Sequence, residues 1–217
     1  MGFTPVNAIP PFGVIILGAG ASVRMGWPKL LLPWNGTTVI GHLIGQWREL
    51  GAAQIAVVHR PGDAELAVEL DRLAFPAPDR LPNPQPERGM FSSILCAANW
   101  DGWRAEIARW AVALGDQPHV RPGTLRAILD CSAQNPGAVC QPEFGGHARH
   151  PVILPRRAFE ELKSSRDKTL KLFLKRTACP SVKCSIADPG LALDMDRPGD
   201  YVRAQVQSSQ LSGHEKT

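Results

Sequence analysis

Short apolar runs alternate with amphipathic stretches along most of the chain. Runs rich in β-branched residues predict buried strands, over residues 13–17, 54–59, 110–114, 138–142 and 151–155. Apolar residues at steps of three and four predict helices, over residues 38–50 and 63–73, near 92–100, and within 121–137 and 156–165. This alternation predicts right-handed βαβ crossovers and a mostly parallel sheet covered by helices, which is an α/β fold.

Length and composition predict one globular domain. The chain has 217 residues, of which 44% are hydrophobic and 20% are charged, enough to bury a full core. We place the domain at 13–204, after an N-terminal extension over 1–12. Residues 205–217 lack an apolar period and are expected to form a disordered tail. Residues 1–12 lack a basic, apolar leader pattern, and no apolar run approaches the length of a membrane span, so secretion and membrane insertion are not expected.

Charge and cysteine content indicate which ligands and which cellular setting to expect. The net charge of +4 comes without dense basic runs, which favours small anionic substrates over nucleic acid. The five cysteines are odd in number and contain no CxxC pair. This argues against a disulfide framework and a zinc ribbon, and it favours a reduced, cytoplasmic setting.

A glycine-rich turn follows the first predicted strand, in VIILGAGASVRMGWPKLLLPW over residues 14–34. Gly18 and Gly20 allow backbone N–H groups to approach a phosphate, and Arg24 and Lys29 can supply positive charge. The spacing fits neither a P-loop nor the dinucleotide fingerprint. Asp116 follows another predicted strand, where a carboxylate can hold a divalent cation near the same phosphates.

Five segments in a fixed order make the chain recognisable. LGAGASVRMGWPKLLLPWNGTTVI is followed by NPQPERGMFSSI, LGDQPHV, RHPVILPR and LDMDRPGDYVRA, which together span residues 14 to about 203. They resemble the motifs of the nucleotidyltransferases that transfer NMP from an NTP, most closely the molybdenum cofactor cytidylyltransferase group. The resemblance implies a three-layer α/β/α Rossmann-like nucleotidyltransferase fold with a mostly parallel central sheet.

The resemblance also implies roles for individual residues. The nucleotide would be bound by Leu17, Gly18, Ala19, Gly20, Arg24, Lys29 and Ser93, with the two cations on the triphosphate. Asp116 and Asp196 would hold Mg²⁺, His150 would contact the acceptor, and Arg24, Lys29 and Asp116 would be catalytic. A terminal phosphate of the acceptor would attack the α-phosphorus of the NTP and release pyrophosphate, so that catalysis rests on positioning and charge neutralisation.

The resemblance favours CTP as the nucleotide and molybdopterin as the acceptor. Ala19 fills a position where related guanylyltransferases carry glycine, and its methyl group would disfavour a purine. Gly18 and Arg149 depart from the family pattern, and so does Lys171. Guanylyl transfer to the same cofactor, nucleotidyl transfer to a sugar phosphate or other alcohol phosphate, and non-catalytic nucleotide binding are the alternatives. A molybdoenzyme or a maturation factor would be the partner protein.

Several residues have a structural interpretation as well. Asp194 either approaches the metal or caps the following turn. His147 and His150 are spaced like a metal pair but lack a third ligand in the sequence nearby, which favours surface or substrate contacts. Trp100, Trp103 and Trp110 are expected to pack in the core rather than stack on bases.

Overall fold

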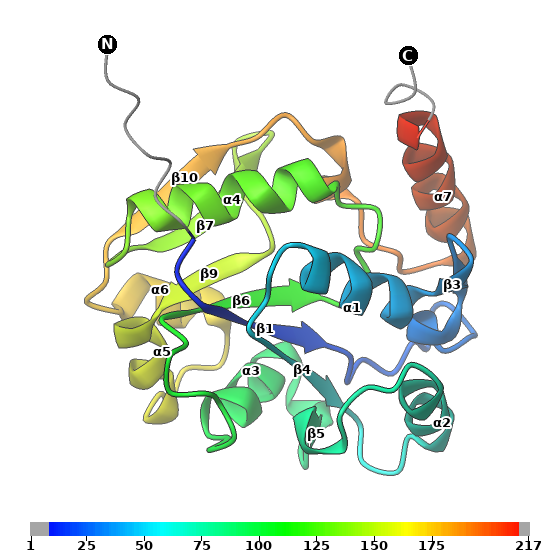
Figure 1. The fold of residues 1–217 in the computed structure, drawn as a ribbon, viewed down its shortest axis with the longest axis horizontal. Helices are drawn as coiled ribbons and strands as arrows, with labels where there is room; N and C mark the ends of the chain where they lie inside the picture. The colour runs from blue at the N-terminus through cyan, green and yellow to red at the C-terminus, as the bar shows by residue number, and fades with distance from the viewer. Residues whose placement is uncertain (1–8, 213–217) are drawn as a thin grey trace.

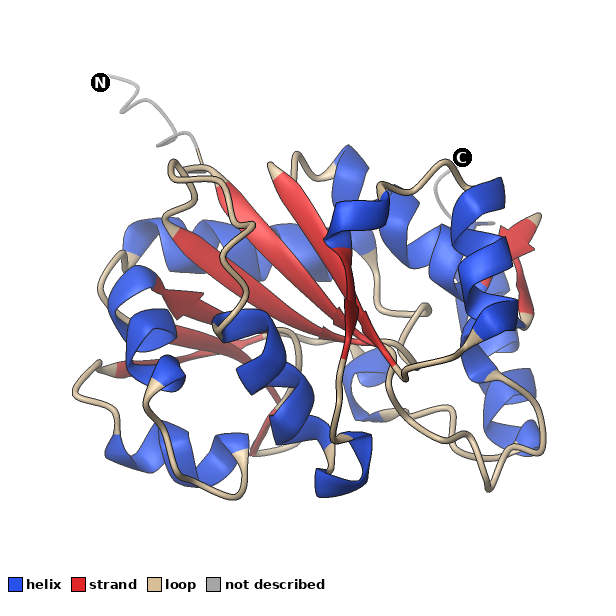
Figure 2. Cartoon of the chain, turned by 90° about the horizontal axis from the view of Figure 1, so that it is seen from below, coloured by secondary structure: helices blue, strands red, loops and turns tan. Residues whose placement is uncertain are grey.

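A computed structural model describes residues 9–212, and its centre is one twisted, mostly parallel sheet (Figures 1 and 2). The strand order is β10-β7-β9-β6-β1-β4-β5, and the short β8 pairs with β7. The strands are β1 (Phe12–Leu17), β4 (Gln54–His59), β5 (Arg80–Pro82), β6 (Arg109–Leu114), β7 (Val139–Phe144), β8 (His147–Ala148), β9 (Val152–Pro155) and β10 (Ser181–Ser185). Of the strands on the main path, β9 runs antiparallel to its neighbours β6 and β7. A separate two-stranded ribbon joins β2 (Pro33–Trp34) to β3 (Thr37–Thr38).

Helices cover both faces of the sheet, so the predicted three-layer α/β/α fold is confirmed. The helices are α1 (Val39–Glu49), α2 (Ala64–Arg72), α3 (Met90–Ala98), α4 (Pro122–Gln134), α5 (Arg156–Lys163), α6 (Leu170–Arg176) and α7 (Pro198–Ser212). Buried residues of α1, α2 and α4 share one apolar cluster with one face of the sheet. Buried residues of α3, α5 and α6 share a second cluster with the other face.

The local signals in the sequence account for the predicted elements. Strand β4 covers the predicted residues, and α1 begins after Thr38, whose hydroxyl oxygen accepts a hydrogen bond from the Gly41 N–H. Asp63 caps α2 in the same way through the Leu66 N–H. The tryptophans near 100–110 pack together as predicted, and the indole of Trp110 stacks on the ring of Phe159.

Three expectations need correction. Phe12, placed in the N-terminal extension, is buried and begins β1. Helix α7 continues to Ser212, so the expected tail is helical over 205–212, and 213–217 lie outside the described residues. Cys131 and Cys184 form a disulfide, because α4 packs over the edge of the sheet that holds β10. The spacing of the cysteines in the sequence gives no indication that these two residues, 53 positions apart, lie close together.

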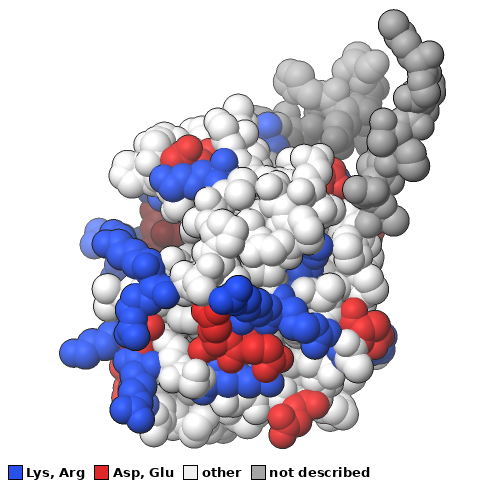
Figure 3. Space-filling view, turned by 90° about the vertical axis from the view of Figure 1, so that its left-hand side faces the viewer, with Lys and Arg blue, Asp and Glu red and all other residues white. Residues whose placement is uncertain are grey.

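The end of the molecule formed by α5 and α6 carries many charged side chains (Figure 3). Acidic and basic groups are interspersed there, with ion pairs such as Lys163–Glu160 and Arg176–Asp167. The Lys163–Glu160 pair is exposed on both sides, and such a pair contributes little to stability. No helix within residues 9–212 has the length and apolar character required to cross a membrane.

Strand order determines where a ligand can bind. From β1 the chain builds β4 and β5 on one side and then returns to place β6 on the other side of β1. Such a reversal leaves a crevice beyond the carboxyl ends of the two central strands. The segments after Leu17 and Leu114 therefore lie side by side, and the Gly115 N–H donates a hydrogen bond to the Leu17 carbonyl oxygen at 3.1 Å.

Candidate nucleotide site

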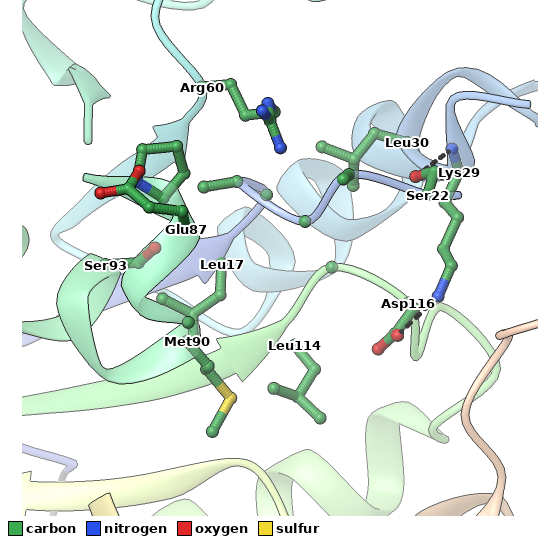
Figure 4. Close-up of a pocket in the computed structure, with 17 residues that line it drawn as sticks. Leu17, Ser22, Lys29, Leu30, Arg60, Glu87, Met90, Ser93, Leu114 and Asp116 are labelled. Atoms are coloured by element: carbon green, nitrogen blue, oxygen red, sulfur yellow. Dashed lines mark hydrogen bonds and ion pairs between the residues drawn. The ribbon is translucent and has the colours of Figure 1, made fainter. Parts of the chain in front are cut away.

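A cavity of about 470 Å³ lies at this crevice (Figure 4). Seven of the residues predicted from the sequence line it: Leu17, Gly18, Ala19, Gly20, Lys29, Ser93 and Asp116. They come from the end of β1 and the segment that follows it, from α3, and from the segment after β6, and so from distant parts of the chain. The topology thus brings the glycine-rich turn and the aspartate together as expected for neighbouring strand ends.

Two glycines pack closely against their neighbours at the floor of the cavity. A Cβ atom on Gly115 would lie 2.6 Å from the Leu17 carbonyl oxygen, so no other residue fits there. A Cβ atom on Gly18 would lie 2.7 Å from the Leu30 side chain and 3.1 Å from the Val58 carbonyl oxygen. An alanine at position 18 would therefore require a shift of the Leu30 side chain and a tight contact with the backbone of β4.

Four charged groups form a chain of ion pairs at one end of the cavity. The Lys29 ammonium lies 3.2 Å from an Asp116 carboxylate oxygen and 2.8 Å from an Asp196 carboxylate oxygen. Arg24 lies outside the cavity lining and contacts the other oxygen of Asp196 at 2.8 Å. Lys29 therefore joins two acidic residues that are far apart in the sequence and shares one of them with Arg24.

The pKa values of the two carboxyl groups are shifted in opposite directions. Burial raises the pKa of Asp116, an effect that the Lys29 ammonium opposes and the nearby Asp194 and Asp196 charges reinforce. The hydrogen bond from Lys29 lowers the pKa of Asp196, and the Lys29 and Arg24 charges add to this lowering. Asp196 therefore stays ionised at lower pH than Asp116.

Asp116 and Asp196 fit the donor set of a divalent cation. Their oxygens converge on a single positive group, the Lys29 ammonium. Mg²⁺ usually takes one or two protein carboxylates and completes its shell with waters and substrate phosphates. The residues 9–212 contain no group of three or more His, Cys, Asp or Glu side chains that could hold a metal by themselves. The two carboxylates would thus depend on phosphate oxygens for the rest of the shell.

Asp194 does not line the cavity, but its charge acts on Asp116. Its carboxylate accepts a hydrogen bond from the Gln117 amide at 2.8 Å. Its negative charge acts to raise the pKa of Asp116 and of His150. The carboxylates that contact Lys29 are those of Asp116 and Asp196. Asp194 therefore contributes negative charge to the site while its carboxylate is positioned by Gln117.

A buried asparagine, Asn83, forms hydrogen bonds with the wall of the cavity that lies across from Asp116. The Asn83 amide donates hydrogen bonds to the hydroxyls of Ser92 and Ser93, at 2.8 and 3.0 Å. The Asn83 side-chain oxygen accepts from the Gln85 N–H, and both Asn83 and Ser93 are buried. The cavity wall at Ser93 is therefore fixed by side-chain hydrogen bonds that sequence reasoning did not reveal.

The histidines stand apart from this cavity. His150 does not line it, and its Nδ1 lies 3.2 Å from the Val112 carbonyl oxygen. Burial lowers the pKa of His150, so the neutral imidazole is favoured. His147 is exposed and contacts the Gly145 carbonyl oxygen. Each of the two imidazoles therefore contacts a different backbone carbonyl oxygen, and neither lines the cavity.

Sequence reasoning also missed Arg60, which lines the cavity from the end of β4. Figure 4 shows its guanidinium at the rim, directed toward the glycine-rich turn. The rule that ligands bind beyond the carboxyl ends of parallel strands applies to β4 as well as to β1 and β6. Applied to the second predicted strand, that rule selects Arg60.

Comparisons with known proteins identify the family of this chain. Residues 14–181 match the family model described as the MobA-like NTP transferase domain. A molybdenum cofactor guanylyltransferase from Pseudomonas paraeruginosa is 26% identical over 195 residues, covering 87% of this chain and 92% of that protein. The bifunctional protein GlmU from Clavibacter sepedonicus is 32% identical over 130 residues, covering 58% of this chain. The chain spans about a quarter of the length of that relative, for which the covered share is 25%.

A solved structure extends the match to three dimensions. The manganese complex of Rv0371C from Mycobacterium tuberculosis H37Rv has a TM-score of 0.66 and 25% sequence identity. That comparison covers 91% of this chain and 98% of the other. The family model covers most of the sheet and includes the glycine-rich turn, Lys29 and Asp116. The chain therefore belongs to the MobA-like NTP transferase domain family and is a nucleotidyltransferase.

Proposed function

We propose that this nucleotidyltransferase transfers CMP from CTP to the terminal phosphate of molybdopterin, with release of pyrophosphate and with Mg²⁺ as the cofactor. The observation that carries the proposal is the convergence of Asp116 and Asp196 on Lys29 beside a cavity lined by the glycine-rich turn. A site that only binds a nucleotide needs no pair of carboxylates at its phosphate end. The pair supports a reaction in which charge builds up on phosphate oxygens.

The role proposed for each residue follows from its position in the cavity. Leu17 and Ser93 line the part of the cavity that would receive the nucleoside, and the turn at Gly18–Gly20 would lie along the ribose and phosphates. Lys29 and Arg24 would neutralise the negative charge that develops on the leaving pyrophosphate. Mg²⁺, held by Asp116 and Asp196, would supply further charge neutralisation and orient the phosphates.

The reaction itself needs no covalent bond to the protein. An oxygen of the acceptor phosphate attacks the α-phosphorus in line, and the bond from that phosphorus to the bridging oxygen of the β-phosphate breaks. The site residues therefore act by orientation and by electrostatic stabilisation. His150 is proposed to contact the acceptor, because it lies in the bend just before β9, which pairs with β6, and because the Asp194 charge acts on its imidazole.

The choice of base rests on Ala19, which is nearly fully buried in the cavity wall. Its methyl group reduces the space for a base placed flat against the backbone, which favours the smaller cytosine. Similarity to a molybdenum cofactor guanylyltransferase favours GTP as the competing nucleotide. A thermal-shift panel of CTP, GTP, ATP and UTP with Mg²⁺ separates them, since a ligand at 100 times its Kd stabilises by about 2.7 kcal/mol. Stabilisation by GTP alone would contradict the role given to Ala19.

Metal dependence is supported by the carboxylate pair and by the manganese complex of the mycobacterial relative. The decisive variant is Asp116→Ala, for which we expect loss of Mg²⁺-dependent pyrophosphate release with an unchanged fold. The matched control is Asp101→Ala, because Asp101 is an exposed aspartate in the turn after α3. Pyrophosphate release with molybdopterin but not with sugar 1-phosphates would establish the acceptor class. Unchanged turnover in Asp116→Ala would overturn the proposed mechanism.

A further inference from the structure

A second cavity of about 300 Å³ lies next to the nucleotide cavity and shares part of its wall. The shared residues are Gly18, Gly20, Ala21, Ser22, Lys29, Leu30 and Arg60. From this wall the second cavity extends past the glycine-rich turn toward Trp27 and Asp63. Lys29 and Arg60 are the basic residues that line both cavities, so positive charge is concentrated at their junction.

The backbone at Arg60 is held by several hydrogen bonds. The adjacent His59 carbonyl oxygen accepts from the Asn83 N–H at 2.8 Å, and the Arg60 carbonyl oxygen accepts from the Asp63 N–H. Asp63 in turn caps α2. Arg60 is therefore presented from a fixed turn between the glycine-rich segment and the segment after β5.

Arg60 differs from the other two cations in its contacts. Lys29 and Arg24 are engaged by Asp116 and Asp196. The Arg60 guanidinium has no hydrogen bond, ion pair or ring contact with any residue in the described part of the chain. Its side chain is exposed at the rim and directed toward the shared wall (Figure 4). A guanidinium in this position has its donors available for a bound anion.

We propose that Arg60 binds the β- and γ-phosphates of the nucleotide together with Lys29, and that the second cavity receives the pyrophosphate product. The inference rests on the proposed function and adds a subsite to it. A guanidinium binds phosphate oxygens bidentately, whereas the ammonium of Lys29 acts as a point charge. The shared wall also carries Ser22 and the backbone of the glycine-rich turn, which provide further donors for phosphate oxygens.

The test is isothermal titration of the full chain with pyrophosphate, CTP and CMP at fixed Mg²⁺ concentration. We expect Arg60→Gln to weaken binding of pyrophosphate and CTP by about ten- to a hundredfold, since a charge-assisted contact is lost. CMP lacks the β- and γ-phosphates, so its affinity should change by less than about threefold. Arg60→Lys should retain part of the affinity for pyrophosphate, because it keeps the charge but not the bidentate geometry.

Arg126→Gln is the matched control, because Arg126 is an exposed arginine on α4 and away from both cavities. It changes the net charge equally and should leave all three affinities unchanged. Equal losses for CMP and CTP in Arg60→Gln, or no loss for pyrophosphate, would overturn the inference. A wild-type protein that binds none of the four nucleoside triphosphates would instead contradict the proposed function. If another base binds best in the thermal-shift panel, its triphosphate and monophosphate replace CTP and CMP.

Discussion

Replacing Lys29 with methionine should have opposite effects on nucleotide turnover and on metal binding. The Lys29 side chain is 15% exposed, and its ammonium contacts Asp116 and Asp196 at 3.2 and 2.8 Å. In the proposed function the same ammonium contacts the triphosphate, and the two carboxylates hold the cation. Lys29 must therefore leave the carboxylates when nucleotide and metal bind. In the protein without nucleotide it competes with the metal for their oxygens.

The magnitudes follow from these contacts. Loss of one preorganised electrostatic contact to the reacting phosphates should lower kcat by about 10²- to 10³-fold. Without the ammonium, Mn²⁺ binding to the nucleotide-free protein should strengthen by about ten- to a hundredfold, since two charge-assisted hydrogen bonds no longer compete. We expect a gain in affinity closer to tenfold than to a hundredfold. The Asp116 and Asp196 side chains are 25% and 32% exposed, so water screens their ion pairs with Lys29.

The assay is titration of free Mn²⁺ by electron paramagnetic resonance in the absence of nucleotide. Arg24→Met is the matched control. It also removes a cation from Asp196, but its side chain is 67% exposed, so the affinity should change by less than about threefold. In Lys29→Met/Asp116→Asn the gain should disappear. Unchanged or weaker Mn²⁺ binding in a folded Lys29→Met protein would refute the idea that the ammonium and the metal share these carboxylates.

Four further predictions address the turn, the acidic pair and the disulfide. A Cβ atom on Gly20 would meet no atom within 4 Å, so Gly20→Ala should leave the melting temperature unchanged while its methyl group weakens CTP binding in isothermal titration. Burial raises the pKa of Asp116, so stability falls as pH rises from the ordinary aspartate pKa to the raised one and stays lower above it. Asp116→Asn should therefore unfold at higher urea concentration than the wild type at pH 7, and an equal or lower midpoint would contradict this. Pairing of Cys131 with Cys184 leaves Cys96, Cys140 and Cys179 as thiols, so titration of the unreduced, denatured chain should count three thiols rather than five. Loss of the link in Cys184→Ala should lower stability by up to about 4 kcal/mol in the chain-entropy model, measured by urea unfolding without reductant.

Local sequence signals were sufficient for most of the sheet and its helices. The β-branched run of β4 and the caps at Thr38 and Asp63 are encoded within a few residues, so their positions follow from the sequence. Helix α7 was missed because its apolar residues show no clear amphipathic period, and Val202 and Val206 are exposed. The antiparallel direction of β9 was also not predicted, since a strand pattern carries no information about direction.

In the candidate site too, the sequence motifs identified some residues, whereas the roles of others depend on contacts between distant segments. The motif resemblance selected Lys29, Asp116 and Ser93 individually, and all three line one cavity. Asn83, which positions Ser93, carries no signal, because a buried asparagine in a proline-rich connector looks like an ordinary turn residue. Arg60 was missed for a different reason: the strand-end rule was applied to β1 and β6 but not to β4.

The contact between Lys29 and its two carboxylates is the feature that sequence alone could least supply. Asp116 and Asp196 lie 87 and 167 positions away from Lys29, and only the reversal of strand order at β1 brings the first of them near. The Gly115 N–H bond to Leu17 then fixes the spacing, because it joins the backbone preceding Asp116 to the strand preceding the glycine-rich turn. A larger residue at position 115 would move Asp116 away from Lys29. The geometry of the charged site is therefore set by a backbone contact between two strands rather than by the charged residues themselves.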